Sequence, residues 1–167
     1  METVSSPSLT DDFREVMSGV CTPVAVVTTM DGDRPHGTTV SAFASLSLEP
    51  PMVLAALDRR SELLALVRAR GRFGLNVLAS GQQALATRFA RKGADKFQGV
   101  PWRTEHGLPR LPGVAGWLAC RVHQLVSGGD HVIALGLVDA AQRLAVSPLT
   151  YHARGFGTHL PVTGERC

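Results

Sequence analysis

Short apolar runs rich in β-branched residues, separated by glycine and proline, make up most of the hydrophobic pattern of this chain. Their length and composition are typical of strands rather than of helices. Two longer runs, 116–127 and 131–144, flank a glycine-rich turn and predict a hairpin. The other runs that we predict as strands are residues 23–30, 36–48, 50–58 and 72–78.

Helical periodicity is limited to three short segments, residues 11–19, 62–71 and 81–93. Thr10 and Ser61 stand where the N-caps of the first two would lie, and both of these segments end at a glycine. Strands outnumber helices and most connections are short. The pattern therefore predicts a mainly β protein, an antiparallel and Greek-key-like barrel with helices packed outside, rather than a parallel βαβ fold.

Length and composition indicate one soluble globular domain. The 167 residues are 44% hydrophobic and 19% charged, and they contain no internal repeat. We expect a domain over 10–160 between a flexible N-terminal tail, 1–9, and a C-terminal tail, 161–167. No apolar run is long enough to span a bilayer, and the first residues lack the pattern of a secretory signal. These features predict a cytoplasmic protein without membrane contact.

Charge, cysteine usage and missing motifs argue against several classes of function. The formal net charge is +3, and the basic residues are scattered except in RFARKGADK, 88–96. A small anionic ligand fits this distribution better than nucleic acid, which needs a denser basic stripe and more aromatic residues. Cys21, Cys120 and Cys167 lack metal-ligand spacing and are odd in number, so we expect neither a metal site nor a disulfide framework. The motifs HExxH, GxSxG, GxxxxGK[ST] and GxGxxG are absent.

Polar residues inside apolar strands are the first candidates for chemistry. Thr38, Thr39 and Ser41 lie within the run 36–48, and Asn76 is central in RFGLNVL. Each of these groups needs a hydrogen-bonding partner if it is buried. They either bind a planar polar ligand or have a solvated or structural role, and the residues alone leave both possibilities open.

The start of the second predicted helix is another candidate. A helix N-terminus at Ser61 would expose backbone N–H groups and a positive dipole end, which suits a phosphate. Arg59 and Arg60 add positive charge just before it. The alternative is an ordinary helix cap beside two solvated arginines.

The chain resembles the short-chain flavin reductases over residues 10–158. The segments GTTVSAFASLSLEPPMVL, RFGLNVL, TRFARKGADKF and GGDHVIALGLV occur in the order found in that family. The resemblance implies an FMN-binding split barrel and an NAD(P)H:flavin oxidoreductase that supplies reduced FMN or FAD to a partner monooxygenase. It also implies a homodimer. The sparse charge at the proposed phosphate site and the absence of a Gly-rich dinucleotide loop predict flavin that is a co-substrate or only loosely bound.

The resemblance also assigns roles to residues. It implies that the flavin ring lies along the 37–42 segment, that the end of the third strand lines the ribityl side, and that the helix start at 61–62 takes the phosphate. Arg88, Arg91 or Lys92 could neutralise the phosphate, or could be exposed. The complete implied flavin site is Gly37, Thr38, Thr39, Val40, Ser41, Ala42, Ala56, Leu57, Asp58, Ser61, Glu62, Asn76, Val77, Leu78, Gln82 and Phe89.

The histidine of the GGDH turn carries the implied catalysis. By resemblance, His131 orients NADH or NADPH over the flavin, and Tyr151, His152 and Arg154 cover the nicotinamide. Hydride transfer needs no general base, which agrees with the lack of paired carboxylates or a Cys–His pair. Without the resemblance, a lone histidine at a turn is usually a surface residue. A non-catalytic flavin carrier on the same barrel, and an anion-binding regulatory module built around RFARKGADK, are the alternatives.

Overall fold

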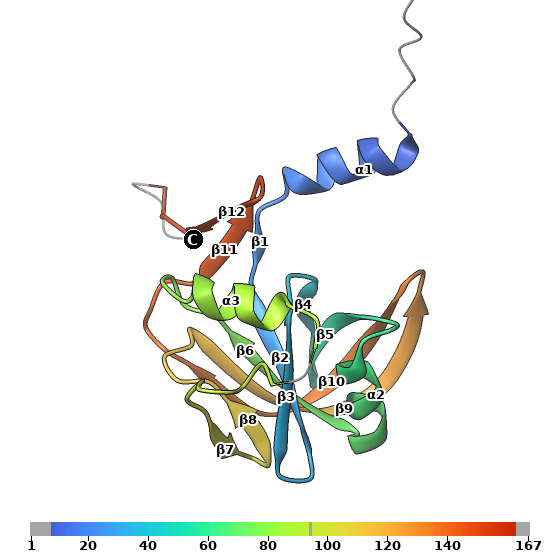
Figure 1. Ribbon diagram of the computed structural model, residues 1–167, viewed down its shortest axis with the longest axis vertical. Helices are drawn as coiled ribbons and strands as arrows, with labels where there is room; N and C mark the ends of the chain where they lie inside the picture. Colours follow the sequence, from blue (N-terminus) through green and yellow to red (C-terminus); the bar gives the residue numbers. More distant parts are fainter. Residues whose placement is uncertain (1–7, 94, 163–167) are drawn as a thin grey trace, which may run out of the picture.

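The computed structural model describes residues 8–93 and 95–162, and it is mostly antiparallel sheet with three helices (Figure 1). No helix in this part of the chain is long and apolar enough to cross a membrane. The elements in chain order are α1 (Leu9–Ser18), β1 (Thr22–Pro23), β2 (Ala25–Asp31), β3 (Arg34–Val40), β4 (Phe43–Leu48), β5 (Pro51–Asp58), α2 (Glu62–Arg70), β6 (Arg72–Val77), α3 (Gln83–Ala90), β7 (Arg103–Glu105), β8 (Leu108–Arg110), β9 (Gly116–Gly128), β10 (His131–Arg143), β11 (Leu149–His152) and β12 (Gly155–Thr158).

Seven strands form the main sheet in the order β3-β2-β6-β9-β10-β5-β4, and every neighbouring pair is antiparallel. This sheet curls into the barrel in the lower part of Figure 1. The order is not sequential, as expected for a Greek-key-like connection. The predicted fold class, a split barrel with flanking helices, is confirmed.

Both faces of the central strands are buried, which explains their continuous apolar sequences. In β2, Ala25 and Val27 join a core cluster with Leu63, Leu64 and Val67 of α2. The residues before and between them, Val24 and Val26, point to the other face. There they join a second cluster, which includes Phe89 of α3, Phe97 and Trp117. The two clusters fix α2 and α3 on the barrel.

Close packing between strands requires glycine at position 74 of β6. A Cβ atom there would lie 2.4 Å from the Trp117 ring and 2.7 Å from Thr28 Oγ1, closer than real Cβ contacts. The missing side chain lets the indole of Trp117, which is 1% exposed, lie across β6.

A second region extends from the barrel, and we call it the arm: α1, β1, β11 and β12. Leu149, the first residue of β11, is 2% exposed and joins the second core cluster, so it anchors the arm to the barrel. The strands form a separate sheet in the order β1-β11-β12, and α1 projects away from the barrel at the top of Figure 1. No residue of α1 is buried. Large apolar side chains of the arm are exposed instead: Leu9, Phe13, Val16, Met17, Tyr151 and Phe156.

The structure differs from the sequence predictions at several boundaries. The N-cap of α1 is Ser8 rather than Thr10, because Ser8 Oγ accepts a hydrogen bond from Asp11 N. The run 36–48 is divided into β3 and β4, and the predicted helix 81–93 is shorter, as α3. Residues 149–152 and 155–158 form the hairpin of β11 and β12. Of the predicted tails, 1–7 and 163–167 lie outside the described residues.

Candidate functional site

Two adjoining pockets open at one side of the barrel, and they share Thr38, Asp58 and Ser61. The small pocket, about 210 Å³, is lined by Thr38, Thr39, Val40, Ser41, Ala42, Ala56, Leu57, Asp58, Ser61 and His131. The large pocket, about 770 Å³, is lined by residues 34–38, 58, 60–63, 90–93 and 95–98. Every residue that lines the small pocket was among the site residues predicted from the sequence.

Strand pairing brings the walls of the small pocket together. In the register of β10 and β5, His131 lies opposite Asp58. On the other side of β5, Ala56 N donates to Ala42 O at 2.8 Å, which holds the two-residue break between β3 and β4 against the end of β5. Ser41 and Ala42 are therefore exposed at the rim, with their backbone available to a ligand.

The two threonine hydroxyls of this pocket form hydrogen bonds within the protein. Thr38 Oγ1 donates to Phe89 O at 3.4 Å, and Thr39 Oγ1 donates to Ala86 O at 2.7 Å. These bonds tie β3 to α3. Each hydroxyl oxygen retains acceptor capacity for a ligand donor.

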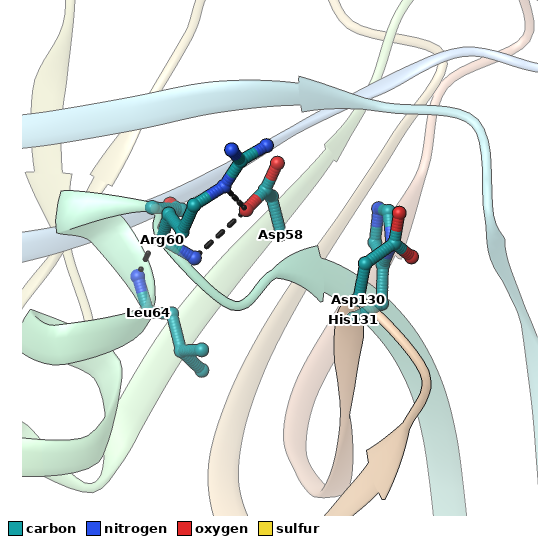
Figure 2. Close-up of polar contacts among 6 residues, drawn as sticks. Asp58, Arg60, Leu64, Asp130 and His131 are labelled. Carbon is teal, nitrogen blue, oxygen red and sulfur yellow. Dashed lines mark hydrogen bonds and ion pairs between the residues drawn. The ribbon is translucent and has the colours of Figure 1, made fainter.

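His131 is held by the residue before it. Its Nδ1 lies 2.7 Å from Asp130 Oδ1, and its side chain is 45% exposed. Figure 2 shows the two side chains next to each other. The hydrogen bond to His131 lowers the pKa of Asp130, so the carboxylate is ionised at neutral pH. The contact with Asp130 thereby orients the imidazole ring of His131 at the start of β10.

The N-terminus of α2 lies where the two pockets meet. Ser61 Oγ accepts from Leu64 N at 3.3 Å, as predicted for an N-cap. Asp58 Oδ1 accepts from Arg60 N at 2.7 Å, and this bond, with a further one from the Arg60 side chain, lowers the pKa of Asp58 (Figure 2). The turn 58–61 is thus fixed by its own polar groups, and it aims the positive end of α2 at the junction.

Cations outnumber carboxylates in the large pocket. Its walls carry the basic side chains of Arg34, Arg60, Arg91, Lys92 and Lys96. The acidic groups are those of Asp58, Glu62 and Asp95. Two of these carboxylates are already paired, Asp58 with Arg60 and Asp95 with Arg34. The pocket is therefore suited to an anionic ligand.

Lys96 and Arg34 are pocket cations that the sequence analysis missed, and Lys96 is the more buried of the two. Its Nζ donates to Gly37 O at 3.2 Å and to Phe89 O at 3.0 Å. Burial lowers its pKa, and Glu62 opposes that shift. Arg88, by contrast, is committed to the loop, because its guanidinium donates to the backbone oxygens of Lys96 and Gln98. Nothing in the run RFARKGADK distinguishes these roles, since they depend on how the loop folds back.

Five predicted flavin residues are not brought to either pocket: Asn76, Val77, Leu78, Gln82 and Phe89. Asn76 is fully buried; its Nδ2 donates to Val26 O at 3.2 Å, and its Oδ1 accepts from Leu111 N at 2.8 Å. The side chain of Gln82 bonds Ala79 N and Pro112 O. The structure thus gives the polar residue in the apolar strand β6 a structural role.

The predicted nicotinamide residues Tyr151, His152 and Arg154 lie in the arm, and none of them lines either pocket. Tyr151 packs edge-on against Phe156, with ring centroids 5.2 Å apart. Arg154 has a φ of 64°, and it belongs to the tight turn between β11 and β12. Of the remaining predicted residues, Gly37 and Glu62 line the large pocket.

The donor set fits a flat, anionic ligand. The small pocket offers backbone and hydroxyl groups around a space of about 210 Å³, and the large pocket adds positive charge beside a helix N-terminus. No group of metal-ligating side chains occurs among the described residues.

Comparison with known proteins decides the family. Residues 17–159 match the family described as Flavin reductase like domain. The chain belongs to this family. It is 39% identical over 138 residues to the reductase subunit HsaB of a flavin-dependent monooxygenase from Mycobacterium tuberculosis, covering 81% of this chain and 74% of that protein. It is 37% identical over 148 residues to a flavin reductase of Pseudomonas putida, covering 87% of each.

Solved flavin reductase structures share the whole fold. The NADH:FAD oxidoreductase SgcE6 of Streptomyces globisporus, in complex with NAD and FAD fragments, superposes with a TM-score of 0.88 at 32% identity. The match covers 98% of this chain and all of that one. BorF, the flavin reductase component of a bacterial two-component tryptophan halogenase, gives a TM-score of 0.82 at 31% identity, over 89% of this chain and 97% of that chain.

Proposed function

We propose that this flavin reductase transfers hydride from NADH or NADPH to FMN or FAD and supplies the reduced flavin to a partner monooxygenase. The observation that carries the proposal is the small pocket, where His131 stands beside the 38–42 segment and opens onto a cationic space. Relatives named as reductase subunits of flavin-dependent monooxygenases support the second part.

In this proposal, different residues bind the flavin ring and the phosphate. The backbone of 38–42 and the end of β5 form the walls for the ring, and the ring supplies the hydride acceptor when it is bound. Ser61 places the positive end of α2 at the phosphate, and Lys96 adds a fixed cation. Because Ser41 and Ala42 are exposed at the rim, we propose that flavin enters and leaves as a co-substrate.

His131 positions the nicotinamide in this proposal. The strand β10 fixes its backbone, and Asp130 holds its ring through Nδ1. Hydride transfer depends on the alignment of donor and acceptor, and it requires no proton relay at this position. The role of His131 is therefore orientation of the dihydronicotinamide.

Substitution of His131 tests this role. His131→Ala should leave the fold and the flavin affinity nearly unchanged, because a half-exposed residue at a strand start contributes little core packing. We expect a loss of about 5- to 150-fold in kcat/KM for NADH, equal to roughly 1–3 kcal/mol. His131→Asn should retain more activity, because it keeps a polar side chain. Wild-type rates of reduction of pre-bound flavin in a folded His131→Ala protein, measured by stopped flow, would contradict the proposal.

We also propose that the protein is a homodimer in the cytoplasm, and that the arm forms part of the dimer interface. Exposed apolar side chains that lie close together, such as those of Leu9, Phe13, Val16 and Met17 in α1, are typical of protein–protein interfaces. The charge of the arm supports a second copy, since α1 carries three acidic residues and one arginine while the whole chain is +3. Sedimentation at micromolar concentration should give a dimer, and a monomer alone would contradict this part.

A further inference from the structure

The two pockets differ greatly in size. The large pocket, about 770 Å³, has more than three times the volume of the small one, about 210 Å³. In the proposed function the flavin ring occupies the small pocket and its phosphate lies at the junction, at Ser61. A ribityl phosphate is smaller than the three-ring system that it carries. FMN would therefore leave most of the large pocket unfilled.

The unfilled part has polar and charged walls on two sides. One side is the start of β3, with Arg34 and His36, and the other is the loop that follows α3, with Arg91, Lys92 and Gln98. Among the described residues, neither Arg91 nor Lys92 has a carboxylate within 4.0 Å. Their charges are thus free to meet an anion beyond the position of a single phosphate.

This arrangement is suited to a second phosphate followed by a nucleoside. A pyrophosphate distributes its charge over two groups, which the α2 end with Lys96 and the Arg91–Lys92 pair could each neutralise. The adenosine would then lie against the start of β3, in a concave space of the size that ligand sites usually have.

We infer that the large pocket binds the adenylate half of FAD, and that the enzyme prefers FAD to FMN. This inference rests on the proposed function, because it takes the small pocket as the ring site. It concerns binding, so affinity tests it independently of turnover.

Titration calorimetry with FAD and with FMN, without nicotinamide, is the direct test. Wild type should bind FAD on the order of tenfold more tightly than FMN. Gln98→Trp, which fills the large pocket from an exposed position, should remove most of that difference and leave FMN affinity within about twofold. The double variant Arg91→Ala/Lys92→Ala should weaken FAD more than FMN. Arg68→Ala is the matched control, because Arg68 is an exposed arginine of α2 outside both pockets, and it should change neither affinity.

Three results would overturn the inference. Equal affinities of wild type for FAD and FMN would show that the large pocket adds nothing. Equal weakening of both flavins by Gln98→Trp would place the effect at the ring or first phosphate. An increase in KM for NADH in the Gln98→Trp protein, with both flavin affinities unchanged, would assign the pocket to the adenylate of the nicotinamide nucleotide. A clear FAD preference without any reduction of flavin by NADH would contradict the proposed function and leave this inference intact.

Discussion

The barrel buries its largest apolar side chains, whereas helix α1 of the arm exposes them. In the barrel, β2 is almost entirely buried, and the largest side chains, such as Trp117 and Phe73, are 1% exposed or less. In the arm, α1 buries nothing, and Leu9 and Val16 are 84% and 69% exposed. An isolated helix of ten residues is marginal in water, because nucleation is costly and few hydrogen bonds follow. The barrel thus has two core clusters of its own, whereas the large apolar side chains of α1 lie exposed.

The same contrast separates the candidate sites. The pockets lie on a rigid frame, where register and core packing position each wall. The arm places Tyr151, His152 and Arg154 on a hairpin outside that frame. Chemistry that needs precise alignment is therefore expected at the barrel, and any contribution of the arm depends on what covers it.

We expect the largest difference in stability between the barrel and the arm when one glycine in each is replaced by alanine. Gly74→Ala puts a Cβ atom 2.4 Å from Trp117, and overpacking of this kind costs about 1–3 kcal/mol or more. At this chain length, each kcal/mol lowers Tm by about 2–4 °C. Gly157→Ala in β12 meets its nearest atom at 3.4 Å and should change stability by less than about 0.5 kcal/mol. Thermal unfolding of both variants by circular dichroism gives the comparison, and equal melting temperatures would contradict it.

The next largest effect on stability compares the loss of a buried side-chain amide in the barrel with the loss of an exposed hydroxyl in the arm. Asn76→Ala leaves Leu111 N without its partner, which costs about 1–3 kcal/mol. Thr22→Val in the arm loses only an exposed bond of 3.4 Å to Tyr151 O and should be nearly neutral. Denaturant titration measures both. If Asn76→Ala keeps its stability but loses flavin binding, the ligand role predicted from the sequence applies instead.

The walls of the small pocket could be predicted from the sequence, but the partners of two polar side chains could not. The pocket walls at 38–42, 56–58, 61 and 131 were all predicted, because they belong to contiguous segments whose order matches a known family. The residues alone left a ligand role and a structural role open for Asn76, because a strand pattern shows which residues are polar but not which loop packs against them. Its partner is the segment at 109–111, where β8 ends. Lys96 was missed for the same reason, because its position depends on a loop that folds back on β3.

A smaller effect is expected in the arm alone. Phe13→Ser with Val16→Ser removes exposed apolar surface of α1 and leaves the barrel core untouched. We expect weaker association, seen as a larger monomer fraction in sedimentation, with the Tm of the dilute protein changed by less than about 4 °C. Replacement of the exposed Leu48 by Ser on the barrel is the control for lost hydrophobicity. Unfolding of the entire chain in the double variant would show that the arm supports the barrel directly.

The smallest perturbation is chemical modification of two thiols. Burial, with a contribution from Asp139, raises the pKa of Cys120 to about 12, so its thiolate is absent at pH 8 and at pH 9. Cys21, between α1 and β1, is exposed. Iodoacetamide followed by peptide mass spectrometry should show alkylation of Cys21 in the native protein, and of Cys120 only after denaturant is added. Equal labelling of the two would mean that the barrel opens as readily as the arm.

Anaerobic mixing of the protein with excess flavin and NADH tests the central claim most directly. Loss of the yellow flavin absorbance over many equivalents per protein is the result expected of a reductase, and it should be much slower in the His131→Ala variant. Flavin that binds without bleaching would contradict the claim and would favour a carrier on the same barrel.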